Sequence, residues 1–154
     1  MDQLFHGHTE NEVETIVFTV GEGTFGISVM NVSEIIHAVA VTPIPNSDPH
    51  IEGIIRLREE IITVANLSKM LGIPPSVVSE QDKFIICEWG QIKIALRVQD
   101  VSRIHRVTKE QIETPDDYSG LSEKNVLGVV RLNDQMVLLL DFEKIVKNMV
   151  KTVS

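Results

Sequence analysis

The stretch from Thr15 to Met30, TIVFTVGEGTFGISVM, decides the fold. Apolar residues run up to Val20, a Gly-Glu-Gly break follows at residues 21–23, and an alternating apolar pattern resumes at Phe25. Alternation with a period of two on either side of a glycine break is typical of two strands joined by a tight turn. The sequence therefore predicts a β-hairpin in this stretch.

The glycines of this hairpin, Gly21, Gly23 and Gly26, also spell a literal GxGxxG motif. In a dinucleotide-binding fold this motif joins a strand to a helix, whereas a second strand is expected here. A protein-kinase glycine-rich loop does join two strands, but it requires a lysine, a catalytic loop and a metal-binding aspartate in further motifs. The chain has only fragments of those motifs, so we interpret the glycines as part of a hairpin.

The same order of features occurs twice along the chain. An offset of 69 residues aligns the first hairpin and the segment after it with a later copy, and an offset of 75 aligns the strands that follow. The matched pairs are Gly21 with Gly90, Val32 with Val101, Ile35 with Ile104, Gly53 with Gly128, Arg56 with Arg131 and Leu57 with Leu132. Six additional residues therefore lie between Ile104 and Gly128, and a capping-box pattern from Thr108 to Gln111 predicts a short added helix there.

Strands and helices are expected at equivalent places in both halves. Strands are predicted over residues 54–57 and 61–65, followed by a helix over residues 67–71 that Asn66 caps and Gly72 ends. Asp141 is expected to cap a final helix whose apolar face consists of Phe142, Ile145, Val146 and Met149. We predict a lead over residues 1–13, then one domain over 14–150, made of subdomains at about 14–80 and 81–140 and a helix at about 141–150. Short, closely spaced strands favour small barrels, because closure removes exposed edges.

Composition and charge exclude several classes of function. The net charge of −8 opposes binding to nucleic acids, which require a basic surface. No apolar run approaches the roughly 18 residues that a membrane span needs, and the first residues are not those of a signal peptide. Cys87 is the only cysteine and lies in an apolar run, so it is expected to be buried in a reduced, cytoplasmic protein.

Side chains capable of chemistry are present, but no complete constellation is. His6 and His8 stand in a polar terminus without the further ligands that a zinc site requires. The acid pairs Glu59-Glu60 and Asp116-Asp117 are expected to be solvated at turns rather than to act as an acid and a base. The sequence therefore predicts a binding protein with no catalytic residues, no metal and no cofactor.

Three stretches carry a resemblance to a known family. They are Phe25 to Val32 (FGISVMNV), Gly53 to Arg58 (GIIRLR) and Val101 to Val107 (VSRIHRV). Together they resemble the CheW-like domain of bacterial chemotaxis coupling proteins, and the details over residues 29–36 and 104–115 are most similar to the N-terminal domain of CheV. The resemblance extends from about Glu12 to Lys147.

The resemblance implies a mainly β fold of two fused, SH3-like five-stranded barrels with short helices and a C-terminal helix. It also implies a cytoplasmic adaptor that links methyl-accepting chemotaxis receptors to the histidine kinase CheA and meets the membrane only through receptor arrays. Receptor binding is implied for Val32, Glu34, Ile35, Gly53, Arg58 and Ile104. Kinase binding is implied for Val41 and Ile44.

The chain departs from the family pattern at one implied binding residue. The family has Asn-Leu-Arg-Gly around this arginine, whereas this chain has Arg56-Leu57-Arg58-Glu59, so the tight turn and its contacts are altered. Two alternative functions stay open. One is that of a CheW-like regulatory domain excised from a larger protein, either a CheV with a receiver domain or a CheA kinase. The other is an SH3-like module for proline-rich peptides, although that mode needs an aromatic-lined groove and the chain has few aromatic residues.

Overall fold

The computed structural model describes residues 11–45, 48–75, 77–114 and 125–153. Its first seven elements are β1 (Glu12–Val20), β2 (Gly23–Ser28), η1 (Val29–Asn31), β3 (Val32–His37), β4 (Ile51–Leu57), β5 (Glu60–Ala65) and α1 (Leu67–Leu71). The remaining seven are β6 (Lys83–Trp89), β7 (Ile92–Val98), β8 (Asp100–Thr108), η2 (Lys109–Gln111), β9 (Val126–Leu132), β10 (Gln135–Leu140) and α2 (Phe142–Val153). The predicted hairpin is confirmed, since β1 and β2 pair in an antiparallel manner around a turn at Gly21.

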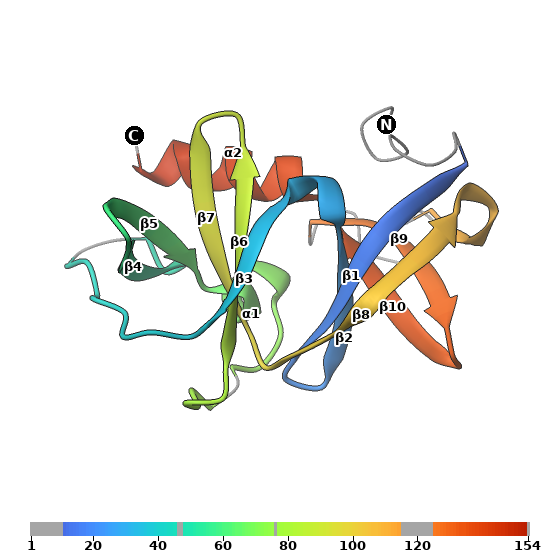
Figure 1. Ribbon diagram of the computed structural model, residues 1–154, viewed down its shortest axis with the longest axis horizontal. Coiled ribbons are helices and arrows are strands. Elements are labelled where there is room, and N and C mark those ends of the chain that lie inside the picture. Colours follow the sequence, from blue (N-terminus) through green and yellow to red (C-terminus); the bar gives the residue numbers. More distant parts are fainter. Residues whose placement is uncertain (1–10, 46–47, 76, 115–124, 154) are drawn as a thin grey trace.

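The strands of the described residues form two five-stranded sheets, which lie side by side in Figure 1. Sheet A has the order β8-β1-β2-β10-β9, and sheet B has the order β3-β6-β7-β5-β4. Each strand of one sheet has its repeat counterpart at the same place in the other, and each sheet contains one parallel pair, β2 with β10 or β7 with β5. The internal duplication read from the sequence is therefore a duplication of topology, and the mainly β prediction is confirmed.

The sheets do not correspond to consecutive parts of the chain, so the expectation that residues 14–80 and 81–140 each build one barrel needs correction. Sheet A combines the β1–β2 hairpin with β8, β9 and β10, while sheet B contains everything from β3 to β7. The reason is the connection after each hairpin. Only η1 separates β2 from β3, and only Gln99 separates β7 from β8, so the chain passes directly into the other sheet. The two repeats thus exchange their hairpins.

Each sheet curls until its edges meet. After β3 the chain returns to β4, where Thr42 and Ile54 exchange two backbone hydrogen bonds of 2.9 Å. The same closure occurs in sheet A, between Glu113 and Val129. We call the closed forms barrel A and barrel B, after their sheets. Closure leaves few unpaired strand edges, which explains why such short strands form a stable fold.

Three clusters of buried side chains hold the molecule together. One fills barrel A and consists of Val13, Val17, Val107, Val130, Val137 and Leu139. Another fills barrel B and consists of Ile55, Ile62, Val64, Phe84, Ile86 and Ala95. The largest joins the outer faces of the two sheets to the helices, and it includes Phe18, Phe25, Leu96, Phe142, Ile145 and Val146. In Figure 1, α2 accordingly runs behind β6 and β7, with its predicted apolar face buried.

Local capping explains where the helices begin and end. The Asn66 side chain accepts a hydrogen bond from the Lys69 amide at 3.3 Å, and Gly72 ends α1 in the left-handed conformation with φ of 70°. The Asp141 carboxylate accepts a hydrogen bond from the Lys144 amide at 3.2 Å at the start of α2. Both predicted caps are confirmed. The helix expected after Thr108 is the three-residue 3-10 turn η2, and residues 115–124 of that segment lie outside the described residues.

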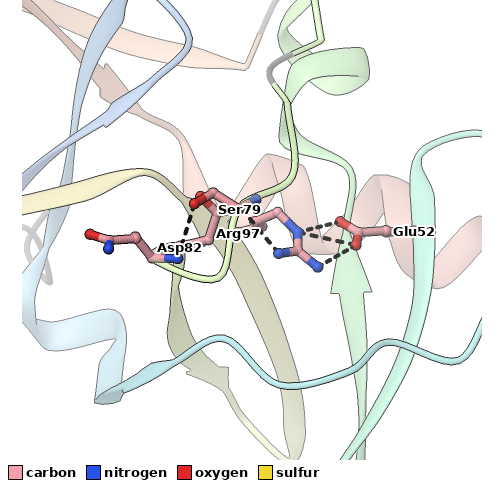
Figure 2. Close-up of polar contacts among 5 residues, drawn as sticks. Glu52, Ser79, Asp82 and Arg97 are labelled. Carbon is pink, nitrogen blue, oxygen red and sulfur yellow. Dashed lines mark hydrogen bonds and ion pairs between the residues drawn. The ribbon is translucent and has the colours of Figure 1, made fainter.

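A partly buried network of charged side chains ties four parts of barrel B together (Figure 2). The Arg97 guanidinium donates to both carboxylate oxygens of Glu52, at 2.7–3.1 Å, and to the carboxylate of Asp82 at 3.2 Å. It also lies 4.9 Å from the centre of the Phe84 ring. The same Asp82 carboxylate accepts a hydrogen bond from the Ser79 amide at 3.0 Å. The network therefore anchors the loop between the two repeats.

Candidate protein-interaction site

Glu34 and Arg58, two of the predicted receptor-binding residues, are brought together by closure of barrel B. Glu34 lies on β3 and Arg58 lies in the turn between β4 and β5, at opposite edges of the sheet. Two parallel hydrogen bonds of 2.8 and 3.1 Å join the guanidinium to the carboxylate. Such bidentate pairing fixes the geometry of both groups. Arg58 nevertheless keeps 69% of its side chain exposed, so it remains available to a partner.

The backbone of Arg58 is unusual. Its φ of 57° lies in the left-handed region, which few non-glycine residues adopt. The equivalent turn between β9 and β10 contains Asn133 and Asp134 at φ of 49° and 64°, and these residue types tolerate that region better. In this turn Arg58 has the left-handed conformation, whereas Glu59, which stands at the position of the family glycine, does not. Strained residues that persist cluster at functional sites, which supports a role for Arg58 beyond stability.

A second ion pair lies at the end of barrel B where Glu34 and Arg58 meet, which we call the mouth of the barrel. This second pair was not singled out from the sequence. The Lys93 ammonium on β7 donates to the carboxylate of Glu60 on β5 at 2.9 Å. This hydrogen bond raises the pKa of Lys93, and the attraction of Glu34 raises it further. The hydrogen bonds from Arg58 lower the pKa of Glu34, while the same bonds raise the pKa of Arg58. The mouth of barrel B is therefore closed by two neighbouring ion pairs of alternating charge.

Removing the guanidinium in an Arg58→Gln variant is expected to return the pKa of Glu34 toward its ordinary value. Because the folded-state pKa of Glu34 is lowered, its ion pair stabilises the fold above the ordinary carboxyl pKa, and this contribution is lost as the pH falls through the lowered value. Carboxyl carbon NMR titration measures the pKa directly. An Arg56→Gln variant, altered on the same hairpin, should leave it unchanged, and an equal response in both variants would contradict the assigned pair.

The apolar receptor-binding candidates are divided between the two sheets. Ile35 on β3 and Ile104 on β8 are exposed to 39% and 51%, and they are equivalent positions of the two repeats. Val32 is half-buried and packs against the large central cluster. Gly53 is buried, and a side chain there would collide with the Thr42 carbonyl. The structure thus gives Gly53 a part in barrel closure, whereas the two isoleucines are free for contact.

The predicted kinase-binding residues differ in exposure. Val41 is half-buried and packs against the core of barrel B, close to Gly53. Ile44 is 38% exposed, and Val39 on the same segment is 46% exposed. The exposed apolar edge of this segment therefore comprises Val39 and Ile44, while Val41 holds the segment against the barrel. The contribution of Val39 was missed because an isolated valine in a loop gives no periodic signal.

Groups with catalytic or ligating potential are otherwise dispersed. Among the described residues, no three His, Cys, Asp or Glu side chains gather in a way that could hold a metal ion. His6 and His8 lie outside those residues. The Cys87 thiol is buried, as predicted, and burial raises its pKa, so the thiolate needed for nucleophilic reactions is disfavoured. Within the same described ranges, no helix has the length and apolarity needed to cross a bilayer.

The fold and this site define a protein-interaction module, in which two closed barrels present an exposed isoleucine on each sheet and barrel B presents an exposed, fixed arginine. Comparison with known proteins identifies the family. The model of the CheW-like domain matches residues 14–149. The chain therefore belongs to the CheW-like domain family, whose members named below are chemotaxis and scaffolding proteins.

Individual relatives agree with this family. The chain is 28% identical over 158 residues to chemotaxis protein CheW of Treponema pallidum, with 92% of this chain and 93% of that protein covered. It is 33% identical over 133 residues to chemotaxis protein CheV3 of Helicobacter pylori, with 83% of this chain and 42% of that protein covered. The crystal structure of scaffolding protein TtCheW from Thermoanaerobacter tengcongensis is similar, with a TM-score of 0.76 and 30% identity, over 88% of this chain and 87% of that one. Both predicted resemblances, to CheW and to CheV, are confirmed.

Proposed function

We propose that this chemotaxis adaptor acts in the cytoplasm, by binding alone, and links the tips of methyl-accepting chemoreceptors to the histidine kinase CheA. The observation that carries the proposal is the Arg58 site, in which a strained turn and a bidentate carboxylate hold an exposed guanidinium in a fixed position. Because the guanidinium is already held in one orientation, less side-chain conformational entropy is lost when a partner binds.

Two further observations support the receptor contact. Ile35 follows Glu34 directly on β3 and is exposed on the opposite face of that strand, so β3 offers an apolar contact as well as the carboxylate that holds Arg58. Interfaces of this type combine buried apolar anchors with charged groups that set register and specificity. The kinase contact is proposed for the segment after β3 that carries Val39 and Ile44, two exposed apolar residues on either side of the Thr42–Ile54 bridge.

Charge reversal in an Arg58→Glu variant is expected to weaken binding to a receptor cytoplasmic fragment by at least about tenfold, because a partner carboxylate or carbonyl would face a negative charge. Co-sedimentation with receptor fragments measures the binding. Arg56→Glu is the matched control, since Arg56 is an exposed arginine two residues earlier on the same hairpin. Equal binding by the wild type and the Arg58→Glu variant would refute the assigned receptor site.

A charge-exchanged variant separates contact from structure. Glu34→Arg combined with Arg58→Glu restores an ion pair of opposite direction, so folding is expected to remain while receptor binding stays weak. Recovery of full binding in the double variant would mean that the pair acts only by closing the barrel. Thermal unfolding of each variant provides the check that the fold persists.

A further inference from the structure

The mouth of barrel A contains a pocket of about 190 Å³ that the proposed function does not use. Val17, Leu132 and Val137 form its apolar floor, next to the core of barrel A. Its rim is polar, and it consists of Thr19, Thr24, Asp100, Ser102, Arg103, His105, Asn133 and Gln135. Sites for drug-sized ligands usually occupy about 300–1,000 Å³. This pocket therefore suits a single side chain or a small ion.

The pocket is the repeat counterpart of the ion-pair site in barrel B. Arg103 stands at the position equivalent to Glu34, and Asn133 stands at the position equivalent to Arg58. The Lys93–Glu60 pair of barrel B is likewise replaced, by Thr24 and Gln135. Barrel B thus closes its mouth with two internal ion pairs, whereas barrel A has neither of them. Barrel A therefore has the equivalent positions, but the residue opposite Arg103 in the pair is Asn133, which has no carboxylate.

An irregularity of β8 places the Arg103 side chain on the rim of this pocket. Arg103 has no hydrogen-bond or ion-pair partner among the residues that the structure describes. The pairing of β1 with β8 is interrupted here, because Ser102 and Arg103 together lie opposite the single residue Val17. A β-bulge of this kind redirects side chains, and bulges are frequent beside binding sites. The bulge accounts for the presence of two successive residues, Ser102 and Arg103, on the rim of one pocket.

Other groups on the rim complete a site for an anion. The Ser102 hydroxyl lies 3.5 Å from Nε2 of His105, and both side chains can donate hydrogen bonds. The Asn133 and Gln135 amides, from the β9–β10 turn and the start of β10, add further donors to the rim. Asp100 is the one acid in the lining, and it is paired with Lys83 at 3.9 Å while 79% of its side chain is exposed. Its charge is therefore offset and screened by solvent rather than neutralising Arg103.

We propose that the mouth of barrel A binds the carboxylate of an aspartate or glutamate side chain from a protein partner, which is held between Arg103 and the Asn133 side of the rim. The partner would supply the acid that barrel B supplies to itself with Glu34. A protein side chain is favoured as the occupant because the pocket is small and open and has an apolar floor that suits the methylene groups of glutamate.

The proposal is tested with small probes that mimic one side chain. N-acetyl-glutamate amide is titrated into the full chain while NMR records the Arg103 Nε–H and His105 ring signals. Saturable shifts are expected with this probe and not with N-acetyl-glutamine amide, which has the same shape without the charge. An Arg103→Gln variant should weaken binding at least about tenfold, since hydrogen bonds to charged groups are the stronger ones.

Two more variants make the outcome decisive. Arg103→Glu with Asn133→Arg recreates the residues of barrel B in barrel A, so this variant is expected to fold and to lose probe binding because its own carboxylate fills the site. Arg56→Gln, altered at an exposed arginine of the other barrel, should bind like the wild type. Equal shifts with the glutamate and glutamine probes, unchanged binding by Arg103→Gln, or binding of inorganic phosphate but not of the carboxylate probe would overturn the proposal. No receptor or kinase is used, so failure here is distinct from failure of the proposed function.

Discussion

An Arg97→Met variant is expected to lose about 3 kcal/mol of unfolding free energy, because removing one partner of a buried ion pair leaves an uncompensated charge. The uncompensated charge is that of Asp82, whose side chain is only 4% exposed. The Glu52 carboxylate, 25% exposed, would lose its bidentate partner as well. Methionine approximates the length of the lost side chain, so the change mainly removes the charge and its hydrogen bonds.

The matched control lies on the same strand. Lys93→Met removes a cation of β7 whose partner Glu60 is 56% exposed, so water replaces the lost contact and stability should hardly change. Adding Asp82→Asn to Arg97→Met removes the buried charge and is expected to recover part of the loss. Urea unfolding followed by circular dichroism gives the free energies. Similar losses in Arg97→Met and Lys93→Met would mean that the network in Figure 2 is solvated in solution.

This network was not predictable from the sequence. Glu52, Asp82 and Arg97 lie on three different segments, and nothing in the spacing of three common charged residues shows that they meet. Period-two alternation identifies a strand and its buried face but does not name its neighbours. The same limit explains the error about the barrels. The repeat was visible in the residues, but the exchange of hairpins depends on where the chain goes after η1, which alternation does not encode.

The residues of the candidate site were predicted from the sequence only where its motifs resemble those of a known family. The resemblance identified Glu34 and Arg58, and the structure joins them in one ion pair. It also included Gly53 among binding residues, where the structure shows a buried position that closes the barrel. Lys93 and Glu60 were missed, yet their signal was present, because the offsets that align the repeats place them at the positions of Thr24 and Gln135. The positions at which the two repeats differ therefore indicate both the ion pairs of barrel B and the pocket of barrel A.

The second large effect is expected from Gly53→Ala, which should lower the unfolding free energy by about 3 kcal/mol through overpacking and backbone strain. The added Cβ would overlap the backbone carbonyl of Thr42 and lie 2.7 Å from Cγ1 of Val41. Backbone cannot rotate away as a side chain can, so relief requires separation of Thr42 from Ile54. That separation opens barrel B at the bridge that closes it.

Two other glycines provide a graded comparison that decides whether Gly53 is a structural or a contact residue. At Gly128, the repeat counterpart, an added Cβ would lie 2.6 Å from the Ile112 side chain and 3.0 Å from the Glu113 carbonyl, so a smaller loss is expected because the side chain can move. At Gly90 nothing lies within 4 Å, and only the φ of 62° is unfavourable, which costs about 1 kcal/mol. If Gly53→Ala and Gly90→Ala lowered the unfolding free energy equally, the collision with Thr42 at the barrel closure would not be the cause of the loss at residue 53. Reduced receptor binding by a stable Gly53→Ala protein would then place Gly53 in the interface itself.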